Sequence, residues 1–176
     1  MMAKEHHTMN AHEKAAHDLL MAAVKEDGQP RDMDSAYREM LDEVYSFKSV
    51  GGPFAYMTPS RVLENEDPTA FSYGFSDYLD SEEVTEIGDE YFDSKELEDI
   101  REQVADALDS EITDLEEQIE ETCDAITEQE GESPADVSEE EARDRSIQAN
   151  SEIRVELTAE LEDKQAILAA VKAYTF

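Results

Sequence analysis

The fold is decided by residues 93–131, which read DSKELEDIREQVADALDSEITDLEEQIEETCDAITEQEG. Apolar side chains recur along this stretch from Leu97 to Ile126 at steps of three or four residues, a mean of about 3.6. That period predicts one amphipathic α-helix. At about 1.5 Å per residue, a helix over residues 94–130 is roughly 55 Å long.

The side of this helix opposite the apolar stripe is strongly acidic. Residues 94–130 contain 15 carboxylates and two basic side chains, Lys95 and Arg101. This is about one net negative charge per 4 Å of helix axis, close to the phosphate spacing of about 3.4 Å along one DNA strand. The acidic face supplies the predicted partner-binding residues: Asp99, Glu102, Asp106, Asp109, Glu117, Glu120, Asp124 and Glu128.

Signals for the ends of the long helix lie on both sides of it. Asp93 is placed to cap its start, and Glu96 three residues later would complete a capping box. Gly131 provides a stop, and residues 131–137 are predicted to form a loop. A connection this short favours an antiparallel pair of helices, although the sequence alone does not fix their relative orientation.

The last helix is predicted over about 139–173, because its apolar positions keep a helical spacing. Ser138 and Glu141 form a second capping box at its start. Apolar residues alternate at 153–157, so a short strand there is an open alternative.

The first 92 residues read as shorter helices around aromatic side chains. The helices are predicted from apolar spacing and start signals: residues 9–26 with Asn10 as a cap, residues 34–48, a short helix from Pro59 and a helix from Pro68. Residues 54–57 are predicted to be extended, and residues 81–88 to form one more helical turn. Eight aromatic residues lie between 54 and 92, which places the core there.

These elements predict a mainly α fold with two parts. Residues 1–92 form a small N-terminal globule, a compact helical platform with an aromatic core. Residues 93–176 form a long antiparallel helical hairpin that carries most of the charge.

The charge of the chain is strongly negative and unevenly distributed. Forty-seven acidic residues outnumber 14 Lys and Arg, for a net charge of −33, and residues 63–176 hold 37 of the acids. Such a surface repels nucleic acid and anionic membranes, and it attracts proteins with basic grooves. The uneven distribution argues against adaptation to high salt, which would acidify the whole surface.

No pattern of catalytic or metal-binding residues is present. His12 and His17 are five residues apart, so their imidazoles diverge on a helix and do not match the spacing of a zinc protease. Phosphate-binding glycine loops, nucleophile elbows and calcium loops are absent from the sequence. We therefore expect no cofactor, no metal site and no enzymatic activity.

The single cysteine and the hydropathy pattern indicate a cytoplasmic protein. Cys123 lies on the apolar stripe, where we expect a buried structural thiol, and one cysteine forms no internal disulfide. No apolar run approaches the roughly 18 residues of a membrane span, and the N-terminus lacks the apolar segment of a signal peptide.

Residues 51–81, GGPFAYMTPSRVLENEDPTAFSYGFSDYLDS, carry a pattern of turn, acidic and aromatic residues. This pattern resembles one in short uncharacterised proteins of phages and prophages. The matching residues are Ser60, Leu63, Glu64 or Glu66, Asp67, Pro68, Ala70, Phe71, Gly74, Phe75, Asp77, Tyr78, Asp80 and Ser81. The resemblance covers less than a fifth of the chain and implies a phage origin. The acidic helical remainder resembles phage DNA-mimic anti-restriction proteins in composition only.

The leading hypothesis from the sequence is an acidic DNA mimic encoded by a phage. It would occupy the basic DNA-binding groove of a host defence nuclease or another DNA-processing protein in the host cytoplasm. The alternative is a structural protein of virion assembly, such as a scaffold, that associates through its apolar helix faces. A homodimer is compatible with either hypothesis.

Overall fold

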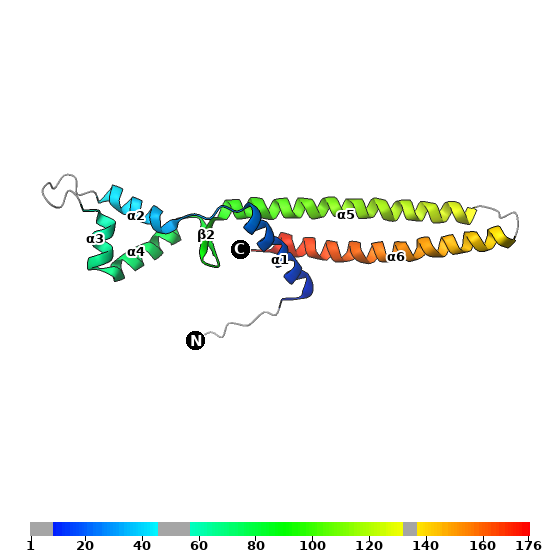
Figure 1. The fold of residues 1–176 in the computed structure, drawn as a ribbon, viewed down its shortest axis with the longest axis horizontal. Coiled ribbons are helices and arrows are strands. Elements are labelled where there is room, and N and C mark those ends of the chain that lie inside the picture. The colour runs from blue at the N-terminus through cyan, green and yellow to red at the C-terminus, as the bar shows by residue number, and fades with distance from the viewer. Residues whose placement is uncertain (1–8, 46–56, 132–136) are drawn as a thin grey trace. The chain divides into compact units, whose positions relative to one another are not determined.

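The computed structural model describes residues 9–45, 57–131 and 137–176 (Figure 1). Its elements in chain order are α1 (Ala11–Asp27), α2 (Met33–Val44), α3 (Pro59–Glu66), α4 (Pro68–Ser81), β1 (Val84–Ile87), β2 (Glu90–Asp93), α5 (Ser94–Gly131) and α6 (Val137–Ala173). The predicted mainly α class is confirmed.

Contacts divide the chain into two units. The hairpin unit joins the chain up to Glu26 with Ile100–Thr175, and the small unit is Asp27–Asp99 together with Phe176. This grouping differs from the predicted ranges 1–92 and 93–176, because α1 packs with the two long helices. The division falls inside α5, which is a single helix from Ser94 to Gly131.

Helices α5 and α6 run side by side in opposite directions (Figure 1). Near the start of α5, Arg101 Nη1 donates to the carbonyl oxygen of Tyr174 at 3.0 Å. Near its end, Gln129 Nε2 donates to Ser146 Oγ at 2.9 Å. Early residues of α5 therefore meet late residues of α6, which confirms the antiparallel hairpin. Residues 153–157 are helical, so the strand alternative is wrong.

The caps of the hairpin unit follow the predicted chemistry in part. Asn10 and Glu13 form a reciprocal pair at the start of α1, in which each side chain accepts from the other residue's backbone N–H, at 2.9 and 2.8 Å. Helix α6 begins at Val137, so Ser138 lies inside the first turn and the prediction that it caps the helix is wrong.

The start of α5, in the small unit, is capped by one residue instead of by a capping box. Asp93 Oδ1 accepts from the backbone N–H groups of Lys95 and Glu96, at 2.9 and 3.4 Å. In the predicted capping box, the Glu96 carboxylate would accept from the backbone N–H of Asp93. It accepts instead from the backbone N–H of Gln29 at 3.1 Å. Glu96 thus ties the start of α5 to the chain that follows α1.

The core of the hairpin unit lies at one end of the hairpin. We call residues 100–115 and 161–173, with α1, the proximal half, and residues 116–131 and 137–160 the distal half. Side chains from all three helices are buried in the proximal half: Ala16, Leu20, Val24, Ile100, Ala105, Leu108, Ile112, Leu115, Leu168 and Val171. In the described part of the distal half, no side chain is buried.

The small unit is built around Tyr37 of α2, which is 2% exposed. Its ring lies 5.2 to 5.5 Å from the rings of Phe71, Phe75 and Tyr78 on α4. Helix α4 contains Gly74 at the point where a Cβ would overlap the Tyr37 hydroxyl, so a glycine is required for this close approach. The predicted aromatic cluster is present, but its organising side chain comes from α2.

Ion pairs and caps fix the helices of the small unit. Arg38 donates to Glu64 at 2.7 and 2.8 Å and to Asp34 at 2.7 Å, and its hydrogen bonds hold the pKa of Glu64 below its usual range. Asp67 caps α4, the helix predicted to begin at Pro68, by accepting from the backbone N–H of Ala70 at 3.0 Å. Helix α2 ends at Val44, and predictions for residues 46–48 and 54–56 lie outside the described residues.

The predicted helical turn at 81–88 is wrong, because β1 and β2 form an antiparallel hairpin there. Val84 pairs with Asp93, and Ile87 pairs with Glu90. The two-residue connection contains Gly88 at φ 67°, a conformation that glycine adopts without strain. A Gly-Asp pair between short β-branched and aromatic runs is a hairpin signal, and it outweighs the helical spacing of the apolar residues.

Candidate partner-binding surface

The eight predicted partner-binding carboxylates all lie on α5 and are exposed to solvent. Seven belong to the hairpin unit, and the eighth, Asp99, belongs to the small unit. Because α5 is one uninterrupted helix from Ser94 to Gly131, its backbone holds these groups at fixed helical spacing. The sequence therefore predicted their exposure correctly.

One of the eight is neutralised by α6. The Asp109 carboxylate lies 3.0 Å from Lys172 Nζ, and the neighbouring Glu111 lies 2.5 Å from Lys164 Nζ. Hydrogen bonding to Glu111 is the main cause of a raised pKa for Lys164. The sequence did not predict these two lysines as partners of α5, because their pairing depends on the register between α5 and α6.

The seven other carboxylates make no ion pair within 4.0 Å to any residue that the structure describes. They form two runs along α5: Asp99, Glu102 and Asp106, and then Glu117, Glu120, Asp124 and Glu128. Ser110 and Thr113 occupy the acidic face between the runs, and the Thr113 hydroxyl donates to the Asp109 carbonyl at 3.0 Å. We call the second run the distal acidic ridge.

The distal acidic ridge concentrates like charge at a cost in helix stability. Its four members lie within residues 117–128, and the first and last are about 17 Å apart along the helix axis. Glu120, Asp124 and Glu128 follow one another at i,i+4, a spacing at which like charges repel by a few tenths of a kcal/mol per pair. No Lys or Arg occurs between residues 102 and 142 of the sequence to offset this repulsion.

The charge is a property of α5 more than of the hairpin as a whole. Helix α5 carries 15 acidic and two basic residues, whereas α6 carries nine acidic and five basic residues. Two of the basic residues of α6 are the lysines that pair with α5. Negative potential is therefore concentrated along one helix.

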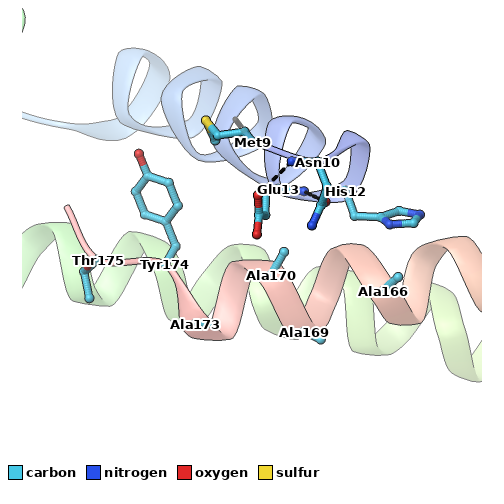
Figure 2. A pocket seen from close by; sticks show the side chains of 10 residues that line it. All are labelled: Met9, Asn10, His12, Glu13, Ala166, Ala169, Ala170, Ala173, Tyr174 and Thr175. Carbon is cyan, nitrogen blue, oxygen red and sulfur yellow. Dashed lines mark hydrogen bonds between the residues drawn. The ribbon is translucent and has the colours of Figure 1, made fainter. Parts of the chain in front are cut away.

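A shallow pocket of about 600 Å³ lies between the start of α1 and the end of α6 (Figure 2). Four alanines of α6 line one side: Ala166, Ala169, Ala170 and Ala173. Tyr174 points its hydroxyl toward α1 and hydrogen-bonds His17 Nδ1 at 2.8 Å, and burial raises the Tyr174 pKa. His12, which also lines the pocket, contacts Asp163 at 2.9 Å.

These contacts give both described histidines structural partners on α6. His12 and His17 bond different residues, as their five-residue spacing predicted. Within residues 9–45, 57–131 and 137–176, no three His, Cys, Asp or Glu side chains are grouped to hold a metal. Cys123, expected to be buried, is half-buried, and among the described elements α6 is the one that lies beside this part of α5 (Figure 1).

Comparison of the chain with protein-family models, curated proteins and solved structures finds no match to any of them. The resemblance of residues 51–81 to phage proteins therefore stays a prediction. None of the helices in the described ranges combines the length and the apolar character that crossing a membrane requires.

Proposed function

We propose that this protein is an acidic mimic of DNA that occupies the basic DNA-binding groove of another protein. The observation that carries the proposal is the distal acidic ridge: four exposed carboxylates, without ion-pair partners among the described residues, on one face of a continuous helix. The target would be a host defence nuclease or another DNA-processing protein. The phage-like pattern of residues 51–81 supports this setting and the host cytoplasm as the place of action.

The mechanism is electrostatic substitution. Carboxylates held on a helix replace phosphates opposite Arg and Lys of the target, and each pair forms charge-assisted hydrogen bonds. Because the ridge is fixed before binding, little conformational entropy is lost. The net charge of −33 steers a basic partner toward the protein, so association is fast and weakens as salt rises.

The test measures duplex-DNA binding by a captured target. The full chain is used to retain DNA-binding proteins from a bacterial lysate at low salt, and the DNA affinity of each retained protein is then measured with and without the chain. We expect inhibition at about 0.1 M salt that is lost by about 0.5 M. Inhibition that is unchanged at the higher salt would contradict the mechanism.

Two matched variants locate the effect. The first neutralises the ridge with Glu117→Gln, Glu120→Gln, Asp124→Asn and Glu128→Gln. The second neutralises four exposed carboxylates of α6 with Glu140→Gln, Glu141→Gln, Glu156→Gln and Glu162→Gln. Both remove four charges, so equal loss of inhibition would indicate bulk charge instead of a ridge. We expect the first variant to weaken inhibition at least about tenfold more than the second.

The absence of buried side chains from the described distal half favours a second candidate, a scaffold of virion assembly. Such a protein would associate into large oligomers through the half-buried apolar faces of α5 and α6. Sedimentation velocity separates the two candidate functions. At micromolar concentration a DNA mimic should sediment as a monomer or small oligomer, whereas a scaffold should sediment as large particles.

A further inference from the structure

The two halves of the hairpin differ in whether a third helix covers the line where α5 and α6 meet. In the proximal half α1 lies against α6 (Figure 2). Hydrogen bonds between His12 and Asp163 and between His17 and Tyr174 join the two helices. Leu20 of α1 and Val171 of α6 are each 0% exposed there. No described segment takes the place of α1 along the distal half.

The distal half presents a half-buried apolar seam between its two helices. We define this distal seam by Ile119, Cys123 and Ile126 of α5 with Ile147, Ile153 and Leu157 of α6. Ile153 is 48% exposed and the others are half-buried. Ile153 and Leu157 lie one helical turn apart on the face of α6 that carries Asn150, whose Nδ2 donates to Gln129 of α5 at 3.4 Å. That hydrogen bond shows that this face of α6 is directed toward α5.

We propose that the distal seam docks a basic amphipathic helix of the partner protein, in the position that α1 occupies in the proximal half. The apolar stripe of such a helix would cover the seam, and its Lys and Arg would be attracted by the net negative charge of the distal half. The proposal rests on the function proposed above and specifies how the basic partner is recognised. The net charge of the distal half then attracts a basic helix, and the apolar seam selects one that carries an apolar stripe.

Charge complementarity selects this occupant over a second copy of the chain. The described distal half carries 14 acidic and three basic residues, a net charge of −11. Two copies packed seam to seam would bring these charges together, and their repulsion opposes association. A helix with Lys and Arg beside an apolar stripe is attracted to these negative charges instead of being repelled. It buries the same apolar surface as a second copy would.

The test uses a synthetic amphipathic peptide of about 20 residues, made of Leu and Lys with Leu at helical spacing, and a scrambled peptide of identical composition. Each peptide carries a fluorophore, and its anisotropy is followed as the full chain is added. We expect the amphipathic peptide to bind at least about tenfold more tightly than the scrambled peptide, because both have the same charge and only one forms an apolar stripe.

Two substitutions on α6 provide the matched comparison. Ile153→Lys places a positive charge on the seam, and Val155→Lys places the same charge two residues away on the opposite side of the helix. Both side chains are exposed, at 48% and 64%, so circular dichroism should show that both variants keep their helices. We expect Ile153→Lys to weaken binding of the amphipathic peptide about tenfold and Val155→Lys to change it less than about twofold.

Three results would overturn the docking proposal. These are equal affinity for the two peptides, equal effects of the two substitutions, and a dimer of the chain alone that Ile153→Lys dissociates and Val155→Lys does not. None of them bears on salt-sensitive inhibition of DNA binding by the distal acidic ridge. Conversely, discrimination between the peptides without inhibition of DNA binding would retain the seam and reject the DNA mimic.

Discussion

The proximal and distal halves of the hairpin are built from the same two helices and reach different degrees of burial. In the proximal half, α1 adds a third layer, and Leu20, Leu108 and Leu168 are buried. In the distal half, Ile119 and Leu157 reach only partial burial, because two helices cannot enclose a side chain from all sides. An amphipathic pattern thus specifies which face turns inward, and a third element decides whether that face becomes a core.

The largest expected effect comes from truncating one leucine in each half. Leu168→Ala should lower the free energy of unfolding by about 2–5 kcal/mol, because it leaves a cavity in the proximal core. Leu157→Ala on the same helix should cost about 1 kcal/mol, since its side chain already contacts water. Urea denaturation followed by circular dichroism measures both values. Equal losses would mean that the two halves are not distinct in packing.

A smaller difference should be visible in amide hydrogen exchange of the unmodified chain. Backbone amides of α5 between residues 100 and 115 should exchange at least about tenfold more slowly than those between 116 and 131, a difference of about 1.4 kcal/mol in opening free energy. Mass spectrometry of proteolytic fragments resolves the two segments. Uniform protection along α5 would show that the distal half is as stable as the proximal half.

The polar layer at the end of the distal half offers a third comparison. Gln129 bonds both Ser146 and Asn150, so its side chain replaces an apolar contact between the helices. The pair Gln129→Leu and Asn150→Leu should stabilise the distal half by about 1 kcal/mol while weakening its register, because polar residues at such positions select one alignment. Gln148→Leu, on the exposed side of α6, is the control for added hydrophobicity. Thermal unfolding of the three proteins measures the change.

The smallest effect concerns pH and the ion pairs of the proximal half. The pKa of Lys164 is raised by Glu111, so its contribution to stability is fully present below the unfolded lysine value of about 10.4 and is lost as pH rises through the higher folded value. Lys164→Met should therefore reduce stability by less than about 1 kcal/mol at pH 8 and by nothing near pH 12. A difference that grows with alkaline pH would have the wrong sign for this pair.

The sequence predicted the elements whose signals are local. The period of the stretch from Leu97 to Ile126 identified α5. Asn10 as a cap and the Pro at position 68 identified helix starts that the structure confirms. The β1–β2 hairpin was not predicted. A four-residue strand is too short to show a clear alternation of apolar and polar residues, and the same apolar residues also fit a helical spacing.

Features that depend on distant residues were not predictable from one sequence. Neither the packing of α1 with the long helices nor the pairing of Asp109 with Lys172 follows from local spacing, because both require the register between elements far apart in the chain. For the candidate surface, the exposure of the eight carboxylates was predictable from the helical period. Which of them are neutralised was not.

The position of Cys123 gives the molecule an intrinsic reporter. It is the only thiol in the chain, and it is a half-buried member of the distal seam between α5 and α6. A maleimide reagent or nitroxide therefore couples at a single place, and its reaction rate or spectrum registers how accessible that place is to water. The native sequence can thus be labelled site-specifically in the distal half without any engineered substitution.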